Sequence, residues 1–426
     1  MERGGNNASS CANRRSEQPS RCGKEHSTDT SENPFCFRSM AMAHPPLTSF
    51  QRHEPELKQT GAVNNNGGGF MDLSHLLPHI PSINPKPLPV SKIVPTPPAG
   101  WAVDKLTRLG YYHPLEPCHV DFPKARLNDM LKQLPECLRL LSCQVSYEDR
   151  WLAAACKTME QVEFQVSFFE DRKDTQVVFI ELQRRCGDSY VFHQDYVQPI
   201  LAVVQRVKHG QAVDATPTQP CRISGMDLDS LLAEHCEQAT DDDVTLAIEL
   251  ATNLVMADRI DALRLGMESL EVLTDTSKTG MSTARKVARV LVVPADEASH
   301  KLVHILLRYI TDESEDQEED IRFRALQVWS NTWQVAADDM ECPLESFCDV
   351  FCSKDTLVRS LMSRVEHVRE QPHEATLALR GLEALCRKND DLLSEVSWPA
   401  VEQAKDLGAA ENVALEQACR KFLKAR

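Results

Sequence analysis

The sequence predicts a multidomain protein with a disordered N-terminal arm, a small α+β module and an all-α domain of repeated helices. Residues 1–99 hold 13 of the 24 prolines and almost no periodic apolar pattern, so they cannot bury enough apolar surface to offset chain entropy. Apolar residues then alternate with polar ones, as in strands, and later recur at steps of three and four, as in helices. The predicted boundaries are an arm at 1–99, the module at 100–208, a linker at 209–224 and the helical domain at 225–426.

Charge divides the chain into two unlike halves. Residues 1–210 carry 24 Lys and Arg against 23 Asp and Glu, whereas residues 211–426 carry 23 against 40. The second half therefore has a net charge of −17, which repels nucleic-acid phosphates and attracts basic partners. We expect it to bind a protein partner through a basic or extended segment, and we expect no nucleic acid.

Cysteine usage and hydropathy predict the compartment. Fifteen cysteines at irregular spacing leave one unpaired, which disfavours a disulfide framework and indicates a reducing environment. The densest cluster, Cys342, Cys348 and Cys352, has no histidine nearby to complete a zinc site, so we expect no metal or other cofactor. No signal peptide and no run of eighteen apolar residues is visible, which predicts a cytoplasmic or nuclear protein without a membrane span.

A short apolar island interrupts the arm. Phe70, Leu73, Leu77 and Ile80 fall at three- and four-residue steps, which suits a docking motif that folds on a partner. Pro78 limits any helix there to about two turns. A tether that packs on the chain's own domain explains the same spacing, and both interpretations stay open.

The α+β module is predicted from its change of period. An amphipathic helix, bent or broken at Pro135, precedes strands in which Phe164 and Phe168 share one buried face. Arg172 to Asp174 form a polar hairpin turn between two of these strands. The predicted order is a helix at 122–141, a strand pair or one long strand within 142–158, strands at 162–168, 175–185 and 190–192, and a helix at 195–207.

The stretch VEFQVSFFED, followed by VVFIELQRRCGDSYVFHQDYVQPIL, resembles kinase-associated domain 1, an α-β-β-β-β-α module at the C-termini of some protein kinases. This chain has no Gly-rich loop, HRD or DFG motif of a kinase domain. The resemblance implies a surface that binds anionic lipid headgroups or a neighbouring protein domain. Acidic neighbours such as Glu170 and Asp171 reduce the positive field there, so solvated strand ends are the alternative. The candidate contact residues are Arg172, Lys173, Arg184 and Arg185.

Everything after the linker is predicted to be helical. Asp241 to Asp243 begin the first helix, where acidic side chains stabilise the positive end of the helix dipole. The acidic run DESEDQEED at 312–320 is predicted to be a solvated loop. The predicted helices are at 241–256, 260–273, 284–293, 298–310, 319–337, 344–370, 373–388, 390–405 and 412–424.

Four helical segments look alike: ALRLGMESLEVL, RFRALQVWSNTW, LALRGLEALCRK and VALEQACRKFLK. They resemble armadillo and HEAT repeats, and LATNL and VWSNTW are similar to the LxNL pattern of the third armadillo helix. The resemblance implies a superhelix whose concave asparagines hold the backbone of an extended peptide beside tryptophans. Asparagines that cap or bridge neighbouring helices are the alternative. The candidate groove residues are Asn253, Trp329, Asn331 and Trp333.

No sequence motif calls for catalysis. GxSxG, HExxH, GxxxxGK[ST] and GxGxxG are all absent from the chain. His235 and Cys236 are adjacent, and on a helix adjacent side chains point apart. We therefore expect a non-enzymatic interaction scaffold or adaptor that uses an acidic helical-repeat surface. Two alternatives stay open, namely an anionic-lipid-reading module acting through the α+β domain, and a regulatory subunit of a separate kinase or ubiquitin-type enzyme.

Overall fold

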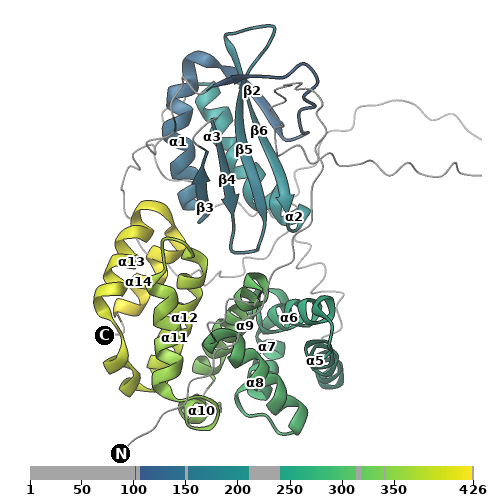
Figure 1. Cartoon of the computed structure of the whole chain (residues 1–426), viewed down its shortest axis with the longest axis vertical. Coiled ribbons are helices and arrows are strands. Elements are labelled where there is room, and N and C mark those ends of the chain that lie inside the picture. The colour runs from purple at the N-terminus through teal and green to yellow at the C-terminus, as the bar shows by residue number, and fades with distance from the viewer. Residues whose placement is uncertain are drawn as a thin grey trace, which may run out of the picture. The chain divides into compact units, whose positions relative to one another are not determined.

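The computed structural model describes residues 101, 106–148, 152–210, 240–312, 318–339 and 342–424. The predicted arm, its apolar island at residues 70–80 and the predicted linker lie outside the described residues. The described chain contains an α+β module followed by a helical region (Figure 1). This agrees with the broad fold class that the sequence predicts.

An antiparallel sheet forms the centre of the α+β module, with strand order β2-β6-β5-β4-β3. Alternation explains the sheet: Phe164, Val166 and Phe168 of β5 are buried, whereas the residues between them are partly exposed. A two-residue strand, β1, pairs in parallel with the end of β5. The strands are β1 Thr107–Arg108, β2 His119–Pro123, β3 Gln144–Tyr147, β4 Ala153–Lys157, β5 Glu163–Glu170 and β6 Val177–Cys186.

Two helices, α1 Leu127–Leu140 and α3 Gln198–Lys208, cover one face of this sheet (Figure 1). Their apolar stripes supply the module's core together with the sheet: Leu134 and Leu138 of α1 and Ile200 and Val204 of α3 are fully buried. Pro135 lies inside α1 and does not break it. Burial of the residues on either side holds the helix together despite the missing backbone donor.

The prediction of a strand at 190–192 is wrong. These residues lie in a short helix, α2 Ser189–Val191, which continues through a π-helical turn at Phe192–Val197 into α3. Asp188 starts the helix because its side chain accepts a hydrogen bond from the backbone N–H of Val191 at 2.9 Å. Phe192 and Tyr196, four residues apart, both pack on Phe164, so the aromatic run is a buried helix face.

The helical region has one continuous core that runs from α5 to α14, and it contains no strand among the described residues after 240. None of the described helices is both long and apolar enough to cross a membrane. The helices are α5 Asp241–Val255, α6 Ile260–Thr274, α7 Thr276–Val292, α8 Glu297–Thr311, α9 Glu319–Asp338, α10 Leu344–Phe351, α11 Lys354–Glu366, α12 Pro372–Lys388, α13 Trp398–Glu411 and α14 Val413–Lys424.

Three predicted helices have other boundaries. The segment 344–370 is two helices, because Cys352 is extended and Ser353 caps α11 by accepting from the N–H of Thr356. The segment 390–405 is a 3₁₀ turn followed by α13, and Pro399 lies in the first turn of α13, where proline is tolerated. Helix α7 begins eight residues earlier than predicted and contains a break at Gly280, whose φ is 79°.

Candidate interaction surface

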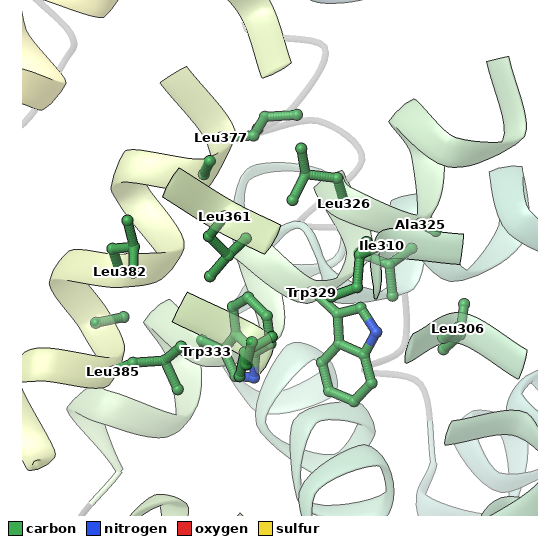
Figure 2. Close-up of a cluster of buried hydrophobic side chains, with 14 of the residues drawn as sticks. Leu306, Ile310, Ala325, Leu326, Trp329, Trp333, Leu361, Leu377, Leu382 and Leu385 are labelled. Carbon is green, nitrogen blue, oxygen red and sulfur yellow. The ribbon is translucent and has the colours of Figure 1, made fainter. Parts of the chain in front are cut away.

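The predicted groove tryptophans lie in the core of the helical region. Trp329 and Trp333 are 0% exposed, and their rings stack with centroids 5.3 Å apart (Figure 2). Gly381 of α12 leaves room for Trp333, since a Cβ there would lie 2.8 Å from the indole ring. A peptide bound on the surface would touch neither indole.

The two predicted asparagines have different surroundings. Asn253 is exposed on α5, next to the end of that helix. Asn331 is partly buried on α9, and its side-chain amide donates to the Thr274 hydroxyl of α6 at 3.4 Å. Asn331 therefore bridges two neighbouring helices, which is the alternative role that the sequence left open.

The four predicted basic contact residues divide into two pairs. Arg172 and Lys173 lie in the turn before β6, whereas Arg184 and Arg185 lie near the other end of that strand. A strand of this length, 10 residues, spans about 33 Å, so the four cations do not form one patch. Arg172 lies over the ring of Tyr111 at 4.8 Å, and Arg184 donates to the carbonyl of Gly187 at 2.6 Å. These contacts fit solvated strand ends better than a single anion-binding surface.

An exposed apolar surface lies instead on the first helix pair, and we call it the outer α5–α6 face. Four large aliphatic side chains on it are 41 to 56% exposed. With a rotation of 100° per residue, the exposed side chains on α5 point about 140–180° away from the buried side of α5. The exposed side chains on α6 point about 160–180° away from the buried side of α6. Half-buried Leu254 extends the surface, whereas Leu273 packs against the core of the helical region. The four exposed residues are Leu246, Leu250, Leu265 and Val272.

Gly266 makes this face continuous across the two helices. A Cβ at Gly266 would lie 2.8 Å from the backbone nitrogen of Val255 and 3.0 Å from the carbonyl oxygen of Ala251, so α5 and α6 touch backbone to backbone. In an antiparallel pair with this register, Leu254 is the α5 residue level with Leu265 of α6. The close approach therefore joins two apolar stripes into one surface.

Three carboxylates around the outer α5–α6 face have local partners. Asp243 belongs to a capping box with Thr240, whose hydroxyl and backbone N–H both donate to it, and these bonds lower the pKa of Asp243. Arg259 pairs with Asp261, and Arg324 lies 2.8 Å from Glu268. Because these charges are already partnered, burial of apolar surface would dominate binding here, with little contribution from electrostatic attraction.

The sequence contains a signal for this face that the helix pattern alone did not separate from the core. Leu246, Leu250 and Leu254 recur at steps of four, on the side of α5 away from Val244 and Ile248. A surface helix needs one apolar stripe to pack against the core, and α5 has a second apolar stripe. The second stripe identifies a face that needs a cover.

A cavity of about 760 Å³ lies where β3, β4 and β5 meet the α13–α14 turn. Polar groups such as Lys157, Arg185 and Asn412 contribute to its lining. The two thiols in the lining, Cys143 and Cys156, are buried, and burial raises the pKa of both. They are therefore neutral thiols near pH 7, and the cavity holds no activated thiolate.

One thiol and one imidazole do lie close together. The sulfur of Cys118 is 3.6 Å from Nδ1 of His193. Partial burial raises the pKa of Cys118, and the charge of Glu116 adds to that shift, so this pair does not produce a thiolate. No group of three His, Cys, Asp or Glu side chains among the described residues is arranged to hold a metal ion.

Comparison of the chain with protein-family models, with curated proteins and with solved structures found no match.

Proposed function

We propose that the chain is a non-enzymatic protein-interaction scaffold whose outer α5–α6 face binds an amphipathic helix. The observation that carries this proposal is the cluster of four exposed aliphatic side chains on two touching helices. Contiguous exposed apolar surface is typical of interaction sites. Leucines repeated along α5 also suit the i and i+4 anchors of a helix laid against another helix pair.

The size of the face sets the strength of binding. Covering four half-exposed aliphatic side chains stabilises a complex by roughly 1 kcal/mol each. About 4 kcal/mol corresponds to a factor of about a thousand in affinity. A partner that also makes contacts around the edge of the face can therefore bind reversibly in the micromolar range.

The proposal includes a stacked arrangement of helix pairs of the armadillo and HEAT kind. Consecutive helices pack side by side in the pairs α5–α6, α11–α12 and α13–α14, and this pairing supports it. In such stacks the terminal repeats usually have a polar outer face. An apolar outer face at one end is therefore a surface that a partner can cover. We place the protein in the cytoplasm or nucleus on the grounds given by its cysteines.

The test compares full-length variants by quantitative affinity capture from cells of the source organism. Leu250→Glu combined with Leu265→Glu introduces charge at the centre of the face while keeping good helix formers. The matched control is Val350→Glu on α10, because Val350 is 64% exposed and lies on another helix. We expect the double variant to retain less than about a tenth of a partner that the wild type and the control both capture. Equal capture by all three proteins would reject the face as the binding site.

A further inference from the structure

An apolar sequence motif lies just before the outer α5–α6 face. Residues 226–232 read MDLDSLL, and α5 has its N-cap at Thr240. Leu228, Leu231 and Leu232 are spaced i, i+3 and i+4, which predicts a short helix with one leucine face. This spacing is the complement that the exposed leucines of α5 and α6 need.

We propose that residues 226–232 dock on the outer α5–α6 face of the same chain. The inference rests on the proposed function, because it names what covers that binding site when no partner is bound. An external amphipathic helix would then have to displace the chain's own segment. The scaffold is thus self-occluded, and its apparent affinity for a partner is lower than the affinity of the open face.

The length of the connection permits this docking. Residues 233–239 separate the motif from the N-cap of α5, and seven residues reach at most about 25 Å when extended. Helix α5 has 15 residues and is therefore about 22 Å long. The motif can fold back over any part of α5, including Leu246 and Leu250.

The short connection also compensates for a weak contact. A ligand joined by a short flexible linker has an effective concentration in the millimolar range. Even a contact with a dissociation constant of about 1 mM is then occupied for about half of the time. Both motif and face carry carboxylates, so docking is driven by apolar burial, and added salt does not weaken it.

The same motif occurs a second time in the sequence. Residues 71–77 read MDLSHLL and match residues 226–232 at five of seven positions. The two copies share every apolar residue and differ in two polar ones. We assign the face to the copy at 226–232, because its connection to α5 is short, and the other copy is one of the outcomes of the test.

The experiment is hydrogen–deuterium exchange measured by mass spectrometry on the full-length chain. In the wild type we expect the amides of 228–232 to exchange about twofold more slowly, or slower still, than in a synthetic peptide of the same sequence, because a segment docked for half of the time exchanges only from its undocked half. Leu250→Glu with Leu265→Glu should return them to the peptide rate, whereas Val350→Glu should leave them protected. Leu231→Ser with Leu232→Ser should increase partner capture, because the face is then open.

Each contrary result overturns a stated part of the proposal. Peptide-like exchange of 228–232 in the wild type rejects self-docking, and so does protection that survives in the Leu250→Glu, Leu265→Glu variant. If residues 71–77 are protected from exchange and 228–232 are not, the face binds the other copy of the motif. If the protection of 228–232 decreases on tenfold dilution of the protein, the motif binds the face of a second molecule. The proposed function is judged separately, since it fails only if partner capture is unchanged in the double variant.

Discussion

The first and last helix pairs of the helical region have similar contacts between their two helices but differ in how much apolar surface they expose. In α5–α6 and in α13–α14 a glycine allows the helices to touch: a Cβ at Gly408 would lie 2.6 Å from the backbone nitrogen of Glu416, much as Gly266 meets Val255. The first pair exposes five large aliphatic side chains, the four of the outer face and Ile260, whereas every Leu, Val, Phe and Trp of the last pair is buried or largely buried.

The last pair also has a cover. The side-chain amide of Asn412 donates to the carbonyl of Ser142 at 3.0 Å, and the N–H of Ala414 donates to the Ser142 hydroxyl at 2.9 Å. Arg139 of α1 is buried and donates to the carbonyl of Ala409 at 3.2 Å. The α13–α14 pair is therefore covered by contacts within the chain, whereas the α5–α6 pair leaves large aliphatic side chains exposed.

Truncation of a buried residue in the α13–α14 pair should have the largest effect on stability. Phe422 is 0% exposed and stacks on Trp398, so Phe422→Ala should lower the free energy of unfolding by about 3–5 kcal/mol. Leu250→Ala should cost less than about 1 kcal/mol, because Leu250 already leaves over half of its surface in water. Urea unfolding followed by circular dichroism measures both. Similar losses for the two variants would contradict the contrast between the ends.

The two glycines test whether the pairs really share one construction. Gly266→Ala and Gly408→Ala each place a methyl group against backbone atoms that cannot move aside, so each should cost about 1–3 kcal/mol. As a control, Gly280→Ala meets no atom within 4 Å, and its cost comes from the positive φ alone. Thermal unfolding of the three variants gives the comparison. A neutral Gly266→Ala would mean that α5 packs more loosely than described, which would split the outer face.

The smallest expected effect is a pH dependence confined to the α12 contact with β4. Nε2 of His373 lies 3.1 Å from the carbonyl oxygen of Lys157, and burial lowers the pKa of His373 below its usual value of 6.5. Below pH 6.5 the His373 imidazole is protonated in the unfolded chain but stays neutral in the folded chain. This residue therefore makes the protein less stable as the pH falls from 7.5 to 5.5. His373→Gln should flatten that part of the profile. An unchanged slope in urea titrations would assign the dependence to other groups.

Sequence patterns predicted the architecture where one periodicity dominated. The alternation in β5 and the apolar stripes of α6, α8 and α9 are unambiguous, and those elements lie close to where they were expected. The segment at 190–192 was misread because aromatic residues favour strands, while the cap from Asp188 and the four-residue spacing of Phe192 and Tyr196 decide for a helix.

The surface was harder to predict than the fold. Trp329 and Trp333 suggested a groove by resemblance, but a helical stripe of large apolar residues is most often core, and both rings are buried. Leu246 and Leu250 resembled ordinary core positions because nothing local shows which stripe of a two-striped helix faces inward. That choice depends on the contact at Gly266, which only the folded arrangement of α5 and α6 reveals.

The stacked indoles of Trp329 and Trp333 give the molecule an internal optical reporter. Neither α5 nor α6 contains a tryptophan, so ligand binding there should leave the emission spectrum almost unchanged. Melting of the central helices, in contrast, would bring both rings into water and shift their fluorescence to longer wavelengths. Tryptophan fluorescence can thus distinguish ligand binding at α5–α6 from unfolding of the central helices.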